Sequence, residues 1–122
     1  MDSPALVNQP AYQEGRRAFD AVKAARIPVR FGLWAYFYEA NEWRFVLLIE
    51  SAAREGPRAI YSLLQRVFTQ NNVTIPLRQV TVTHPGEPLG VLVFTAAQYG
   101  ETFSNPMSAN LNVRIDTRSI YR

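Results

Sequence analysis

The chain has no cysteine among its 122 residues, which excludes disulfide bonds, thiolate zinc sites and cysteine nucleophiles. His84 is the single histidine, so a transition-metal site built from this chain alone lacks its usual ligands. Glycines are scattered, and neither the dinucleotide-binding pattern nor the Walker pattern occurs. We therefore expect no metal and no cofactor.

Long apolar segments are also missing. Uninterrupted apolar runs such as Phe45–Ile49 are far shorter than the ~20 residues that a membrane-spanning helix needs. The first residues, Met-Asp-Ser-Pro-Ala-Leu-Val, lack the basic and apolar regions of a secretory signal. These features predict a cytoplasmic protein with no membrane partner.

Lysine is scarce too, because Lys23 is the only one and the other twelve basic residues are arginines. The formal net charge of +3 permits an anionic partner without requiring one. Arginine is suited to phosphate contacts and to protein interfaces. A genome rich in G and C gives the same bias without any functional meaning, so both interpretations stay open.

The chain is expected to fold as one α+β domain over residues 1–122. Hydrophobic residues make up 48% and charged residues 19%, which is enough apolar surface for one core. Residues 1–9 have no hydrophobic period and are expected to form a loose N-terminal arm. A helix is expected from about Pro10 to Arg26, and Pro28 ends it.

Two strands follow, at 29–38 and 43–50, because each shows the period of two that is typical of a strand. The short polar segment 39–42 between them predicts a hairpin. A second helix is expected over 57–70, where apolar residues recur on one side. Residues 77–83 and 89–95 resemble a second hairpin around Pro85-Gly86, residues 96–110 a loop, and residues 111–116 a last edge strand.

This order, α-β-β-α-β-β-β, predicts a two-layer sandwich. Its sheet is mainly antiparallel, has four to five strands and carries two helices on one face. The other face is then the candidate functional surface. If the odd-numbered residues of the first strand face the helices, the opposite face presents the following side chains, the last of them from the second strand: Arg30, Trp34, Tyr36, Tyr38 and Arg44.

Three interpretations of this face compete. It is a homo-oligomer or protein-partner interface, since aromatic residues and arginine are frequent at binding hot spots. It is a platform for single-stranded nucleic acid, on which bases stack and arginines hold phosphates. Or residues 96–122 cover it, and its aromatic residues belong to a second side of the core.

The second strand bears on this choice, because Val46 and Leu48 make it apolar on both faces, as is typical of a covered central strand. We therefore expect a small non-catalytic module that associates with itself or with another protein, with nucleic acid as the alternative. An enzyme is a third hypothesis. His84, Glu50 and Arg54 are its weak candidates, because they lie near the ends of expected elements.

Overall fold

The computed structural model describes residues 7–100 and 111–122. The helices are α1 (Gln9–Ala24), the short α2 (Ala52–Glu55), α3 (Pro57–Gln70) and α4 (Pro88–Tyr99), with a 3-10 turn, η1, at Leu77–Gln79. The strands are β1 (Val29–Phe37), β2 (Glu42–Ile49), β3 (Val80–Thr83) and β4 (Val113–Ile115). The α+β class expected from the sequence is confirmed.

The four strands form one mixed sheet in the order β3-β2-β1-β4. β1 pairs antiparallel with both β2 and β4, whereas β3 runs parallel to β2. The predicted first hairpin and the predicted edge strand near residues 111–116 are both confirmed. The central position of β2 is confirmed as well, and its last five residues, Phe45–Ile49, are fully buried.

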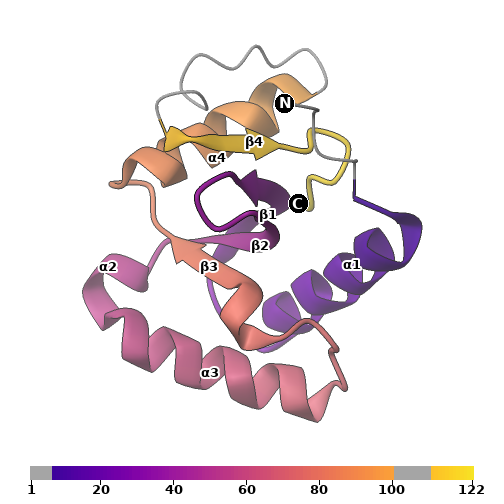
Figure 1. The fold of residues 1–122 in the computed structure, drawn as a ribbon. Helices are drawn as coiled ribbons and strands as arrows, with labels where there is room; N and C mark the ends of the chain where they lie inside the picture. The colour runs from indigo at the N-terminus through magenta and orange to yellow at the C-terminus, as the bar shows by residue number, and fades with distance from the viewer. Residues whose placement is uncertain (1–6, 101–110) are drawn as a thin grey trace.

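Helices cover both faces of this sheet, so the molecule has three layers instead of the expected two (Figure 1). On one side α1 and α3 pack over Trp34, Phe45, Leu47 and Ile49. On the other side α4 packs over Leu33, Ala35, Val46 and Leu48. Each central strand therefore contributes apolar side chains to two cores, which explains why β2 reads as apolar on both faces.

The third layer arises because residues 89–95 are helical and not a strand. Pro88 occupies the first turn of α4 and Gly100 follows its last residue, an arrangement that favours a helix. A short apolar run fits a buried strand and a buried helix equally well when only its composition is considered. The expected second hairpin is therefore wrong, and β3 leads into α4.

The start of α1 and the end of α4 also differ from the boundaries that the sequence predicted. Asn8 caps α1 by accepting a hydrogen bond from the backbone N–H of Ala11 at 2.9 Å, so the helix begins inside the segment that was expected to be a loose arm. Ala96–Tyr99, expected as the start of a loop, complete α4. The rest of both predictions, at residues 1–6 and 101–110, lies outside the described residues.

α1 sits close to the sheet because of a glycine. A side chain at Gly15 would overlap the hydroxyl of Tyr121 and the indole nitrogen of Trp34. Tyr121, near the C-terminal end of the chain, accepts a hydrogen bond from Trp34 Nε1 at 3.1 Å and donates one to the backbone oxygen of Tyr12 at 2.7 Å. Gly15 therefore brings the helix, β1 and the C-terminal segment together at one point.

Candidate functional site

Trp34, the centre of the predicted binding face, lies in the core. It is 5% exposed, and its ring packs at 5.3 Å from that of Phe45. Its backbone N–H donates to the hydroxyl of Ser119 at 3.2 Å, and its indole N–H donates to Tyr121. Trp34 is therefore not part of an exposed binding face, because α1 and residues 119–121 cover it. For this residue the structure agrees with the third interpretation, in which the C-terminal segment covers the face.

Arg30 and Arg44 lie on the opposite side of the sheet from Trp34. The guanidinium of Arg30 is 5.3 Å from the ring centre of Phe94 in α4, and that of Arg44 is 5.1 Å from the ring centre of Phe37. Arg30 also pairs with Glu50 at 3.5 Å, and Arg44 with Glu42 at 2.9 Å. The structure therefore does not bring the five predicted residues into one surface.

The hairpin register explains this division. Trp34 pairs with Phe45 and Tyr36 with Trp43, so the even-numbered residues of β1 share a face with the odd-numbered residues of β2. The prediction had placed even-numbered residues of both strands together. A shift by one residue moves every side chain of a strand to the other face. Trp43, and not Arg44, therefore lies on the Trp34 side of the sheet. The prediction had placed Trp43 on the opposite face.

Part of the Trp34 side of the sheet remains open near the tip of the hairpin. Tyr36 is paired with Trp43 on one side and with Arg114 of β4 on the other, so the three lie in one row across the sheet. Tyr36 packs edge-to-face against Trp43 at 5.5 Å and against Tyr38 at 5.2 Å. All four residues are partly exposed, and we call them the aromatic–arginine face: Tyr36, Tyr38, Trp43 and Arg114.

Two further features describe this face. Arg114 forms no ion pair with any residue in the described part of the chain. Tyr36 donates a hydrogen bond to the side chain of Asn41, whose left-handed backbone (φ 56°) shapes the hairpin turn. This hydrogen bond and the contacts with Trp43 and Tyr38 restrain the ring of Tyr36.

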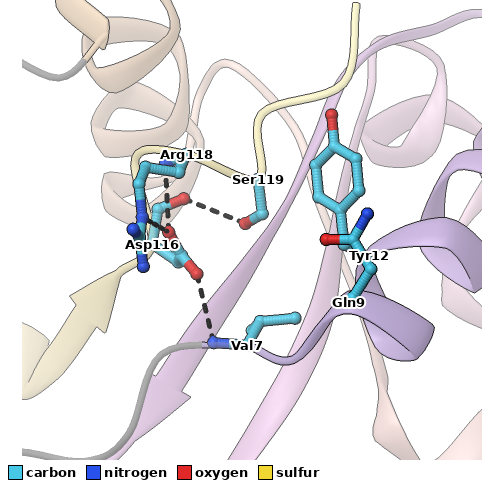
Figure 2. Close-up of a pocket in the computed structure, with 6 residues that line it drawn as sticks. All are labelled: Val7, Gln9, Tyr12, Asp116, Arg118 and Ser119. Atoms are coloured by element: carbon cyan, nitrogen blue, oxygen red, sulfur yellow. Dashed lines mark hydrogen bonds and ion pairs between the residues drawn. The ribbon is translucent and has the colours of Figure 1, made fainter.

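A cavity of about 300 Å³ lies on the same side of the sheet, between the first turn of α1 and the turn at residues 116–119 (Figure 2). Its walls come from both segments: Val7, Gln9, Tyr12, Asp116, Arg118 and Ser119. Figure 2 shows that Tyr12 and Gln9 line one wall, while the carboxylate of Asp116 lies on the opposite one.

Asp116 is 4% exposed, and its carboxylate is already used by the fold. One oxygen accepts from the backbone N–H of Val7 at 3.2 Å, and the other from that of Arg118 at 3.0 Å. The Arg118 guanidinium is 3.9 Å away. A buried carboxylate must be satisfied in this way, and Asp116 thereby ties the start of α1 to the turn after β4.

The residues proposed for an enzyme do not form a catalytic arrangement in the described part of the chain. His84 Nε2 lies 3.1 Å from Glu87, and its Nδ1 accepts from the backbone N–H of Gly86 at 3.0 Å, so both ring nitrogens serve the β3–α4 connection. Glu50 pairs with Arg30. Arg54 is an exposed residue of α2.

Within residues 7–100 and 111–122, no group of three or more histidine or acidic side chains is placed to hold a metal ion. No helix in those same ranges has both the length and the apolar character needed to cross a bilayer. Compared with known proteins, the chain matches no family model, no curated protein sequence and no solved structure.

Proposed function

We propose that this protein is a small non-catalytic interaction module that binds another protein through the aromatic–arginine face. The observation that carries the proposal is the row Arg114, Tyr36, Trp43 on the part of the sheet that the helices leave open. Partly exposed aromatic rings beside an arginine that has no ion partner among the described residues have the composition of an interface hot spot.

The chemistry of the face indicates what it binds. The rings offer apolar contact area, and the Arg114 guanidinium offers a planar pair of donors for a carboxylate. We infer that the partner presents an apolar or aromatic side chain to Tyr36 and Trp43, with an acidic side chain beside it for Arg114. Both the orientation and the specificity of binding then depend on Arg114.

The test is affinity purification of the protein from its native cells, followed by titration with the purified captured partner. Arg114→Glu should weaken binding at least tenfold, because it places a carboxylate opposite an acidic group. Arg66→Glu is the matched control, since Arg66 is exposed on α3 and away from this face. A partner that binds both variants as tightly as the wild type contradicts the proposal.

Single-stranded nucleic acid is the alternative ligand, and Arg114 is the observation that favours it. This arginine adds a phosphate-binding group directly beside the rings on which bases stack. Fluorescence anisotropy with labelled oligonucleotides at low salt, on the same two variants, distinguishes the ligands. Binding that falls with salt and with Arg114→Glu supports nucleic acid, whereas no binding at low salt removes it.

The cytoplasmic location expected from the sequence belongs to this proposal. Microscopy of the tagged full chain in its native cells tests it.

A further inference from the structure

A groove of about 550 Å³ lies at the β3 edge of the sheet, where η1 leads into β3. Its size is within the range of small-molecule sites, roughly 300–1,000 Å³. The residues that line it come from β2, α3, η1 and β3 and include two arginines and no acidic residue: Arg44, Tyr61, Leu77, Arg78, Val80 and Thr81. It shares no residue with the aromatic–arginine face or with the cavity beside Asp116.

The backbone along this groove is already bonded within the fold. The hydroxyl of Tyr61 accepts from the N–H of Val82 and donates to the carbonyl of Val80, both at 3.1 Å. The N–H of Val80 donates to the carbonyl of Leu77. An added peptide strand would need these same backbone groups, so recognition in the groove depends on side chains.

Arg44 is restrained by two neighbours. Its Nε donates to the carboxylate of Glu42 at 2.9 Å, and its guanidinium lies 5.1 Å from the ring centre of Phe37. The bond to Glu42 uses Nε alone among the nitrogens of the guanidinium. The two terminal nitrogens, with four N–H donors between them, are therefore the groups that Arg44 offers to a ligand in the groove.

Arg78 and Thr81 supply the other polar groups of the groove. Arg78 is exposed in η1, directly after Leu77, which packs against the core, and it forms no ion pair with a described residue. Thr81 pairs with Val46, so its side chain lies on the same face of the sheet as Arg44. The Thr81 hydroxyl is partly exposed and makes no hydrogen bond within the described part of the chain.

We propose that this groove binds a small phosphate monoester, whose phosphate is held by Arg44, Arg78 and Thr81 and whose organic part lies against Tyr61 and Leu77. Two arginines on separate elements match the nearly double charge and the three acceptor oxygens of a phosphate. A carboxylate, in contrast, is satisfied by one bidentate arginine. The apolar area of Tyr61 and Leu77 favours an organic part that is apolar or aromatic.

Phenyl phosphate is the probe, because its ring represents the organic part, and inorganic phosphate is the comparison. Each is titrated into the full chain at low salt and about pH 8, where the phosphate is doubly charged, and binding is followed by heteronuclear NMR. The wild type should bind phenyl phosphate with a dissociation constant of about 0.1–1 mM. Inorganic phosphate should bind roughly fivefold more weakly, because it lacks the ring. The amide signals of residues 77–81 should shift most.

Two substitutions test the assignment of the phosphate contacts. Arg78→Gln should weaken the binding of phenyl phosphate about tenfold, because it removes a charged donor. Thr81→Val keeps the shape of the side chain but removes its hydroxyl, and should weaken binding about threefold. Arg66→Gln is the matched control, since Arg66 is an exposed arginine of α3 that does not line the groove, and it should bind like the wild type. The same NMR spectra show whether each variant is folded.

Two results overturn the proposal: no binding of phenyl phosphate at about 10 mM, or equal binding by the wild type and Arg78→Gln. Equal affinities for the two probes contradict the contact of the organic part with Tyr61 and Leu77. The groove lies apart from the aromatic–arginine face, so Arg114→Glu should bind phenyl phosphate as tightly as the wild type. Failure of this site and failure of the proposed function are therefore distinguishable.

Discussion

At the scale of single residues, the hydroxyl of Tyr121 links three segments of the chain through two hydrogen bonds. It accepts from Trp34 and donates to the backbone of Tyr12, so one buried oxygen joins β1, α1 and the C-terminal segment. Burial raises the pKa of Tyr121 well above its ordinary value, although the hydrogen bond from Trp34 acts in the opposite direction. The phenol is therefore neutral in the folded protein at pH values where it ionises in the unfolded chain.

Tyr121→Phe should reduce the free energy of unfolding by about 1–3 kcal/mol, because it leaves the buried N–H of Trp34 without its acceptor. Tyr38→Phe is the control; it removes a hydroxyl at a partly exposed position and should change stability by less than about 0.5 kcal/mol. Urea denaturation followed by tryptophan fluorescence measures both variants.

The raised pKa of Tyr121 also predicts how the free energy of unfolding of the wild type depends on pH, with Tyr121→Phe as the comparison. The folded state retains the proton of Tyr121 where the unfolded chain loses it, so stability is complete below about pH 10 and falls as pH rises further. The fall should be shallower in Tyr121→Phe. If the free energy of unfolding fell equally steeply with pH in the wild type and in Tyr121→Phe, the raised pKa of Tyr121 would be contradicted.

At the scale of elements, side chains complete the hydrogen bonding that short strands and helix ends leave open. The hydroxyl of Tyr61 in α3 accepts from the N–H of Val82 and donates to the carbonyl of Val80, both at 3.1 Å, along the outer side of β3. An edge strand with free backbone groups is a template for unwanted pairing. Tyr61 therefore disfavours association through this edge.

Glu14 ties α1 to the segment that follows α3. Its carboxylate accepts from the backbone N–H and the hydroxyl of Thr74 and pairs with Arg17. Burial raises the pKa of Glu14, but the hydrogen bonds from Thr74 and Arg17 outweigh it, so the pKa is lowered from its ordinary value of 4.5. The charged form of Glu14 therefore stabilises the folded state.

Glu14→Gln should reduce the free energy of unfolding at neutral pH by about 1–2 kcal/mol, since hydrogen bonds to a charged group are lost. In the wild type this contribution is present above pH 4.5 and is lost as pH falls through the lowered pKa. Denaturation at several pH values should therefore show less acid sensitivity in the variant. Asp20→Asn, which affects an exposed pair with Arg16, is the control and should change little.

At the scale of the whole molecule, the sheet separates two surfaces with different chemistry. The side of α1 and α3 carries the aromatic–arginine face and the cavity near Asp116, and the side of α4 carries an uncharged helix. Substitutions on opposite sides of a sheet share no contacts and act independently. Val91→Glu, a substitution at an exposed position of α4, should thus leave the affinity for the captured partner within about twofold of the wild-type value.

Much of the fold follows from local pattern. The alternation in β1 and the apolar stripe of α3 each predict an element, because each period is defined by the residues of that element alone. The polar segment 39–42 likewise predicts the turn from its own composition. The candidate site could be predicted only in part. Tyr36 shares the face of Trp34, as expected, but α1 and α3 pack over that face and not over the odd-numbered residues of β1. Arg44 lies on the other face, because a hairpin register depends on the turn geometry and on which face each strand buries.

The sequence by itself determined the α+β class, the first hairpin, the helices α1 and α3 and the central position of β2. Only the tertiary structure decided that residues 88–99 form a helix, that Trp34 is covered by α1 and Tyr121, and that Arg114 stands beside Tyr36. The physical reason is the range of the interactions. Periodicity and turn residues act over a few positions, whereas the choice of buried face and the pairing of Arg114 with Tyr36 join segments almost eighty residues apart.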